Sequence, residues 1–205
     1  MSAACLTTSS AKTFGVLRRA DFFMTIFQFP TVTWAAWDAD VTFFPGTQLP
    51  RESEGGLYAV LVFLFYGDKF VLADIVGRGM CIPSGRMEPG ETIDQTAVRE
   101  CFEETGALLH DQSRTLIGCY RMTTRSGPQA GQTRWNPVFV AEVLGFNPLP
   151  VGSESRGMFL AAVEDVADVY FFWDELIAAV FDYAEQERRT RFPPGTMLSA
   201  LTEGK

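Results

Sequence analysis

Four side chains that could bind a metal ion and a phosphate chain fall close together in the sequence, at Arg99, Glu100, Glu103 and Glu104. On an α-helix, glutamates at positions i, i+3 and i+4 project from one face, where their like charges repel one another. Hard divalent ions such as Mg²⁺ take oxygen ligands and gather carboxylates that would otherwise destabilise the helix. The spacing therefore predicts a metal site on a helix.

A solvated acidic helix with i, i+4 ion pairs is the usual explanation of such a charge run. It does not account for Gly85, for Gly106 or for the adjacent Arg99–Glu100 pair. The metal site is therefore the preferred hypothesis.

The segment also carries the start and stop signals of a helix. Thr92 and Gln95 have the spacing of a capping box, and Gly106 suits the left-handed residue that ends a helix. We therefore expect a helix over Ile93–Glu104. Its apolar side should contain Ile93, Ala97, Val98 and Cys101.

The stretch from Gly85 to Ala107, GRMEPGETIDQTAVRECFEETGA, resembles the Nudix box, G-x5-E-x7-R-E-U-x-E-E-x-G-U, in which U is a bulky aliphatic residue. All of its fixed positions match, namely Gly85, Glu91, Arg99, Glu100, Glu103, Glu104 and Gly106. Cys101 and Ala107 replace aliphatic residues at two U positions. Because cysteine behaves as a small buried hydrophobe, we interpret these as packing variants.

The resemblance implies Mg²⁺, with Mn²⁺ as a substitute, held by the carboxylates of Glu100, Glu103 and Glu104 and by the carbonyl of Ser84. Many family members have Gly-Gly where this chain has Ser84-Gly85, and a carbonyl ligand survives that exchange. Glu100 or Glu103 would activate the attacking water, and the sequence leaves the choice between them open.

The resemblance also implies supporting roles for three other residues. Arg99 would orient the carboxylates, and Glu91, about two helical turns earlier, is its expected partner. Glu154, in the segment VGSESRG, lies where several triphosphatases of the family place a further catalytic carboxylate in a loop that faces the metal.

Segments outside the box, such as GRGMCIPSGRMEPGE, are similar to those of bacterial nucleoside triphosphatases of this family. This implies a pyrophosphohydrolase that converts a (d)NTP or an oxidised purine dNTP to a monophosphate and pyrophosphate. ADP-ribose or a nucleotide sugar is the alternative substrate. A third reading is a nucleotide-binding regulator without hydrolysis, although such regulators commonly lose box carboxylates and this chain keeps all four.

Other residues could contact the substrate through phosphate or base contacts. Arg78, Arg121, Arg125 and Arg134 could bind phosphates, although each alone is more often a surface residue. The four tryptophans could stack on a base, although core packing is the commoner role. The polar, glycine-rich segment 123–134 is expected to form a loop that could reach the substrate.

The chain has 205 residues, enough for one sizeable core, and a net charge of −8. That charge disfavours binding to a nucleic-acid backbone, although a 5′-triphosphate RNA end stays open as a substrate. The expected partner is a small nucleotide. We expect an N-terminal extension over 1–55, a Nudix domain over 56–192 and a tail over 193–205.

Apolar runs bounded by turn residues predict strands. The clearest pair is Leu57–Tyr66 and Lys69–Val76, joined at Gly67-Asp68 as a hairpin. The other expected elements are strands at Phe22–Phe29, Thr31–Trp37, Thr115–Met122, Trp135–Val143 and Met158–Val163, a turn-rich linker from Asp38 through Pro50, and a helix at Phe172–Arg189.

This pattern indicates an α+β fold. The resemblance implies the Nudix fold, a mixed β-sheet core sandwiched between α-helices, here with an N-terminal β extension. The N-terminal strands could extend the monomer's own sheet or pair across a homodimer.

The chain has one histidine, His110, which disfavours catalysis by a Ser-His-Asp or Cys-His arrangement. The four cysteines lack the spacing of a zinc site, so we expect them to be reduced. The N-terminus lacks the order of a secretory signal. We therefore expect a soluble, cytoplasmic protein.

Overall fold

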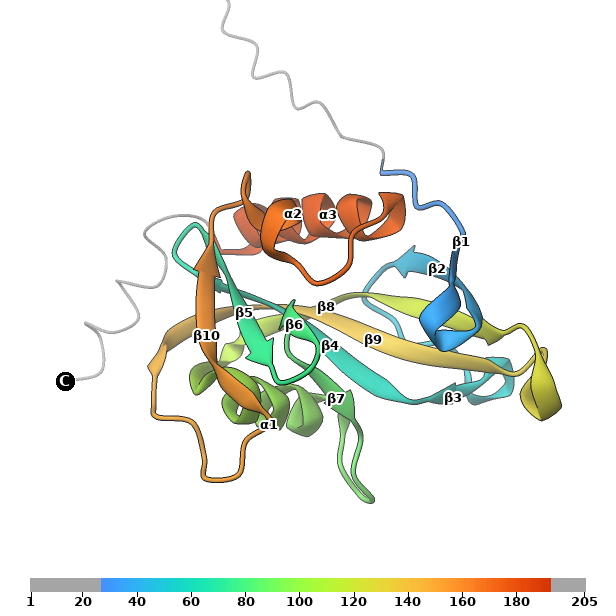
Figure 1. The fold of residues 1–205 in the computed structure, drawn as a ribbon, viewed down its shortest axis with the longest axis horizontal. Coiled ribbons are helices and arrows are strands. Elements are labelled where there is room, and N and C mark those ends of the chain that lie inside the picture. Colours follow the sequence, from blue (N-terminus) through green and yellow to red (C-terminus); the bar gives the residue numbers. More distant parts are fainter. Residues whose placement is uncertain (1–26, 193–205) are drawn as a thin grey trace, which may run out of the picture.

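The computed structural model describes residues 27–192 (Figure 1). Ten strands form one mixed sheet, with the main order β1-β2-β8-β9-β4-β5-β10. The strands are β1 Val32–Trp34, β2 Ala39–Pro45, β3 Gly56–Leu57, β4 Ala59–Tyr66, β5 Lys69–Ile75, β6 Gly79–Cys81, β7 Ser84–Arg86, β8 Ala107–Thr124, β9 Thr133–Phe146 and β10 Ser155–Ala161. The α-helices are α1 Ile93–Thr105, α2 Val166–Val169 and α3 Glu175–Arg191.

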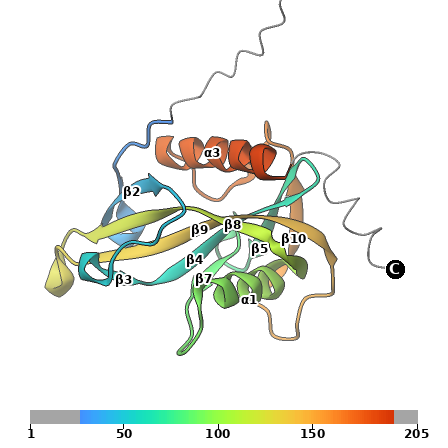
Figure 2. The same cartoon turned by 180° about the vertical axis from the view of Figure 1, so that it is seen from behind.

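The sheet lies between helices, with α1 on one face and α3 on the other, as both views show (Figures 1 and 2). The central strands β4 and β9 pair in parallel, whereas β4–β5 and β8–β9 pair antiparallel. Central strands buried on both faces read as continuous apolar runs, which explains the sequence AVLVFLFY of β4. The α+β fold with a mixed sheet between helices is confirmed.

Each face of the sheet has its own apolar core. Ala97 and Cys101 of α1 pack against one face, and Leu176, Val180 and Phe181 of α3 pack against the other. Fully burying one such large side chain contributes roughly 1.5–3 kcal/mol. The two helices are therefore held in place by packing on opposite sides of the same strands.

Helix α1 has the termini that the sequence predicts. Thr92 and Gln95 form a complete capping box, and Gly106 adopts φ 70° at the C-terminus. A side chain at Gly106 would also overlap the carbonyl of Asn147. Both the positive φ and the lack of space therefore require glycine at this position. The expected apolar side is correct for Ala97 and Cys101, whereas Val98 is wrong because its side chain faces solvent.

The N-terminal region differs from the prediction. The expected strand Phe22–Phe29 lies mostly outside the described residues, and its described part, 27–29, is not in a strand. The linker expected after Trp37 is wrong in its first half, because Ala39–Pro45 forms β2. This strand alternates buried and exposed residues and pairs along its whole length with β8.

Strands β1 and β2 therefore extend the sheet of this same chain, one of the two arrangements that the sequence allows. The predicted strand Thr31–Trp37 is wrong in its second half, because Ala35–Trp37 forms a 3-10 helix and only Val32–Trp34 is a strand. The remaining predicted strands and the second helix are present with shifted ends; β8 and β9 extend beyond their predicted ranges. The polar loop between them contains a short 3-10 helix, Gly127–Gln129.

Cys81, Cys101 and Cys119 are free and buried, as expected for reduced thiols, while Cys5 lies outside the described residues. His110 belongs to β8 by its backbone, and its side chain is not described. Within residues 27–192, no helix has both the length and the apolar character needed to cross a membrane.

Candidate active site

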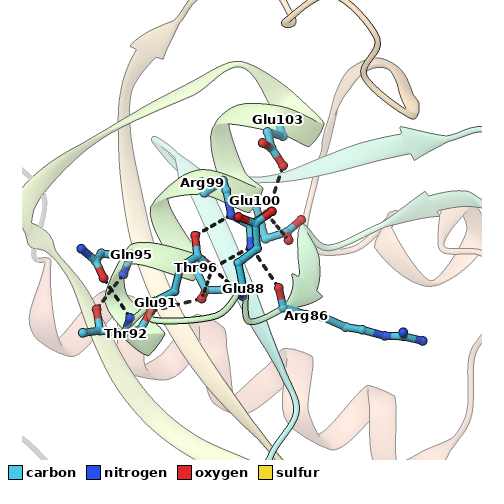
Figure 3. A network of polar contacts seen from close by, with 9 residues as sticks. All are labelled: Arg86, Glu88, Glu91, Thr92, Gln95, Thr96, Arg99, Glu100 and Glu103. Atoms are coloured by element: carbon cyan, nitrogen blue, oxygen red, sulfur yellow. Dashed lines mark hydrogen bonds and ion pairs between the residues drawn. The ribbon is translucent and has the colours of Figure 1, made fainter.

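Arg99 is the centre of a polar network that joins strand β7, the loop before α1 and α1 itself (Figure 3). Its Nε and Nη2 atoms donate to the two carboxylate oxygens of Glu91, at 2.7 and 2.9 Å. Its Nη1 atom donates to Glu100 at 2.6 Å and to Glu103 at 3.1 Å. Nη2 also donates to the carbonyl of Arg86, at 2.9 Å. One guanidinium therefore fixes three carboxylates and the strand that precedes them.

Glu91 is itself held from several sides. Its Oε2 atom also accepts from the Thr96 hydroxyl and from the backbone N–H of Glu88, each at 2.9 Å. Arg99, and next the Glu88 backbone, lower the pKa of the Glu91 carboxyl to about 2. Glu91 thus ties the loop before α1 to the arginine, the partnership that the sequence predicts.

Glu100 lies in a space that only glycine at position 85 leaves open. A Cβ atom at Gly85 would overlap the Glu100 carboxylate. The residue is 8% exposed, and burial raises the pKa of its carboxyl, which the Arg99 guanidinium opposes. The strand before the box and the helix within it therefore meet at this carboxylate.

Glu104 is turned toward the same strand. Its Oε2 atom accepts from the backbone N–H of Ser84, at 3.0 Å. Burial, with the nearby negative charges of Glu100 and Glu154, raises the pKa of the Glu104 carboxyl to about 7. A buried carboxylate with few hydrogen bonds and negative neighbours is stabilised when a cation binds to it.

Glu154 approaches the network from the loop before β10. The hydroxyl of the neighbouring Ser153 donates to the carbonyl of Glu103, at 2.7 Å, and so docks this loop on the end of α1. Glu154 is exposed there, and its charge acts on Glu104. The structure therefore brings together all the predicted box carboxylates, Glu154, Arg99 and the backbone of Ser84.

The donors at this site fit a hard divalent cation. Three box carboxylates face a single guanidinium and Glu104 lies beside them, and oxygen atoms are the ligands that such ions prefer. Within residues 27–192, however, no three acidic, cysteine or histidine side chains converge as a ready metal cluster. Arg99 explains this, because it holds Glu100 and Glu103 while the Ser84 N–H holds Glu104. Metal ligation by these residues stays a prediction.

A cavity of about 330 Å³ adjoins the network on the face of the sheet that α3 covers. Ser84, Gly85 and Arg86 line it, so the cavity and the carboxylate network share one stretch of backbone. A volume of this size is at the lower end of the range for small-molecule sites. A ligand in the cavity would reach the carboxylates across Gly85.

The cavity separates the four candidate arginines into two pairs. Arg78 and Arg134 line it. The Arg121 guanidinium lies outside the lining, over the ring of Phe44 at 4.8 Å, and Arg125 is paired with Asp40 at 3.4 Å. The structure therefore leaves Arg78 and Arg134 as the candidates for phosphate contacts.

Arg86 is a candidate that the sequence analysis missed. Its carbonyl faces Arg99, whereas its side chain extends away from the network (Figure 3). Its guanidinium lies 5.1 Å from the centre of the Tyr58 ring, and that of Arg134 lies 4.9 Å from the same ring. Tyr58 thus gathers two cations at the cavity, a grouping that residue spacing does not reveal.

Strand β1 and the 3-10 helix Ala35–Trp37 that follows it contribute one aromatic wall of the cavity. Trp34 and Trp37 line it, and both rings contact Phe172, another lining residue. The Nε1 atom of Trp34 donates to Asp174 at 2.8 Å, and Asp174 also caps α3. Strand β1 and the start of α3 are therefore fixed to each other at the cavity.

Comparison with known proteins identifies relatives that are similar in sequence to parts of this chain, and a solved structure with a similar fold. A 63-residue stretch is 36% identical to YtkD of Bacillus subtilis (strain 168), named "Putative 8-oxo-dGTP diphosphatase", covering 31% of this chain and 39% of YtkD. A 27-residue stretch is 63% identical to Nudix hydrolase 3 of Caenorhabditis elegans, covering 13% of this chain and 11% of that protein. The chain thus spans well under half the length of either relative.

The structure is similar to the crystal structure of the Bacillus subtilis pyrophosphohydrolase BsRppH, with a TM-score of 0.57 and 21% identity, over 72% of this chain and 91% of that one. That likeness supports the fold. The family sequence model of the NUDIX domain matches residues 57–183 of this chain. This range contains the box, the Arg99 network and most of the residues that line the cavity. The chain belongs to the Nudix family.

Proposed function

We propose that this protein is a metal-dependent pyrophosphohydrolase that cleaves a nucleoside triphosphate, with an oxidised purine dNTP as the leading candidate, to a monophosphate and pyrophosphate. The observation that carries the proposal is the position of the carboxylate network, which meets an aromatic, arginine-lined cavity at Ser84–Arg86. The similarity to YtkD supports the choice of substrate. ADP-ribose or a nucleotide sugar is the second candidate, because the same features suit any nucleoside diphosphate linkage.

The proposed cofactor is Mg²⁺, with Mn²⁺ as a substitute, bound by Glu100, Glu103, Glu104 and the carbonyl of Ser84. When bound, the ion would neutralise charge on the phosphate oxygens. Glu100 or Glu103 would take the proton of the attacking water. The water oxygen forms a bond to phosphorus, the bridging P–O bond breaks, and pyrophosphate leaves.

The chain's other residues position these groups. Arg99 holds Glu100 and Glu103 and is itself oriented by Glu91. Arg78, Arg86 and Arg134 would bind phosphate oxygens at the cavity. Glu154 would add negative charge on the side of Glu104. A net charge of −8 makes such local cations important for an anionic substrate.

The test is hydrolysis by the purified full chain. With Mg²⁺, it is incubated with dNTPs, 8-oxo-dGTP, ADP-ribose, nucleotide sugars and a 5′-triphosphate RNA, and products are separated by anion exchange. We expect pyrophosphate from a triphosphate, loss of activity with EDTA, and recovery with Mg²⁺ or Mn²⁺. Binding without turnover across the panel would favour the regulator.

The matched variant is Glu103→Gln. The side chain is 47% exposed, so we expect the melting temperature to change little. Loss of the carboxylate should lower kcat by about 10²–10⁴-fold. Glu164→Gln, on an exposed loop, is the control and should retain wild-type turnover. Near-normal turnover in Glu103→Gln would contradict the assigned role.

A further inference from the structure

Asn136 has a buried polar group without a partner. The residue lies in β9, opposite Tyr120 of β8, and is 3% exposed. Its Nδ2 atom is buried and has no hydrogen-bond partner among the described residues. Buried polar groups are nearly always paired, and an unpaired donor destabilises the fold. This donor therefore needs an acceptor that residues 27–192 do not provide.

Asn136 also lines the cavity beside the box. Its neighbours there include Trp34 and Tyr120, whose rings lie 5.6 Å apart between centres. Flat aromatic walls suit a planar heterocycle, and one fixed polar group among them suits recognition of its edge. The charged groups Arg86 and Arg134 line the same cavity and suit the phosphates of such a ligand.

We propose that Asn136 selects the nucleobase by donating its Nδ2–H to a ring carbonyl oxygen, and that the cavity therefore takes a 6-oxopurine nucleotide. This rests on the proposed function for the reaction, but concerns the base alone. Guanine has an acceptor oxygen at C6, whereas adenine has an amino donor there. Two donors facing each other leave both unpaired, so adenine would be rejected.

The side chain at position 136 is poorly explained by stability alone. Leucine is close to asparagine in size and would remove the unpaired donor, so Asn136→Leu should fold as well as the wild type or better. In that case the Asn136 carboxamide serves ligand binding and does not stabilise the fold. This separates a selecting residue from a structural one, because a structural amide would lower the melting temperature when lost.

The first test compares ligands on the wild-type chain and needs no variant. kcat/KM is measured for dGTP, for dITP, which keeps the C6 oxygen, and for the 2-aminopurine analogue, which lacks it. We expect dGTP and dITP to be similar and the analogue to be about tenfold poorer. Equal values for all three, or a preference for dATP, would overturn the proposal.

The second test uses Asn136→Leu, with Asn147→Leu as the control on an exposed loop outside the cavity. The ratio of kcat/KM for dGTP to that for dATP should fall about tenfold in Asn136→Leu and stay unchanged in the control. An unchanged ratio in a folded, active Asn136→Leu protein would contradict the assignment.

A binding experiment separates this inference from the proposed reaction. GMP and AMP are titrated while tryptophan fluorescence is followed, since Trp34 and Trp37 line the cavity. Tighter binding of GMP that disappears in Asn136→Leu would support the inference even if no triphosphate is hydrolysed. Equal binding of GMP and AMP would overturn it even if hydrolysis is confirmed.

Discussion

The carboxylate network and the cavity are adjacent, yet they are built in different ways. The network is local, since Arg99 binds partners between Arg86 and Glu103. The cavity is assembled from distant segments, with walls from Trp34 in β1 and Phe181 in α3. One region depends on spacing along the chain, and the other on how the sheet and α3 pack.

This difference predicts separate roles for the network and the cavity. The network is polar and nearly saturated with hydrogen bonds, so a small displacement of one carboxylate disturbs its neighbours. The cavity is lined mostly by apolar side chains, many of them aromatic, and contains an unpaired amide, so its properties depend on shape and on one donor. Changes in the network should therefore alter kcat, whereas changes in the cavity should alter KM and base preference.

Two glycine substitutions test the first half of this comparison. In Gly85→Ala, the new methyl group would overlap the Glu100 carboxylate, which can move away at the end of a flexible side chain. Misplacing a catalytic group by about 1 Å can cost roughly 100-fold in rate, so we expect kcat to fall by about 10- to 100-fold. Thermal unfolding should show only a small loss of stability.

Gly118→Ala is the matched control for the same chemical change. Its methyl group would overlap the ring of Phe43 and the backbone carbonyl of Phe44 in β2, which cannot move freely. Overpacking of this kind costs about 1–3 kcal/mol in the free energy of unfolding. The folded fraction should keep its kcat. If Gly85→Ala loses stability and keeps kcat, the network does not have the role proposed.

The local region is also the one that the sequence predicts well. The capping box and the left-handed Gly106 follow from spacing on one helix, the Glu91–Arg99 pair follows from the resemblance to the Nudix box, and all are present. The central hairpin β4–β5 follows from apolar runs around the Gly67-Asp68 turn. These features depend on interactions between residues close in sequence, so no tertiary information is needed to find them.

The cavity could not be predicted in the same way. Strand β2 was missed because it begins with Ala39-Asp40 and ends at Pro45, which are poor strand signals, and pairing with β8 overrides them. Arg86 and Asn136 have no special spacing, and only the fold brings them beside Tyr58 and Trp34. An asparagine within the apolar run of β9 was the one available signal for a buried polar group.

Trp34→Phe tests the wall that lies outside the matched Nudix region. The change removes the hydrogen bond from Nε1 to Asp174 and should cost about 1–2 kcal/mol in the free energy of unfolding. A smaller ring at the cavity should raise KM several-fold and leave kcat unchanged. Trp173→Phe, which packs on Phe181 and does not line the cavity, should leave KM unchanged. Equal KM changes in both variants would argue against a specific wall.

The smallest expected effect concerns the pH dependence of the network. The pKa of Glu91 is lowered to about 2 from an ordinary value of 4.5, so its ion pair stabilises the fold above pH 4.5. Below that pH the unfolded chain takes up a proton that the folded chain does not, and this stabilisation is lost as pH falls toward 2. In urea titrations, the wild type should therefore be more stable than Glu91→Gln at pH 6, and the difference should narrow between pH 4.5 and 3.

Glu88→Gln is the control. The Glu88 carboxylate has no ion pair within the described residues, so the stability of Glu88→Gln should differ little from that of the wild type at pH 6 or at pH 3. A gap between the wild type and Glu91→Gln that stays constant with pH would mean that Glu91 acts in the network without its charge.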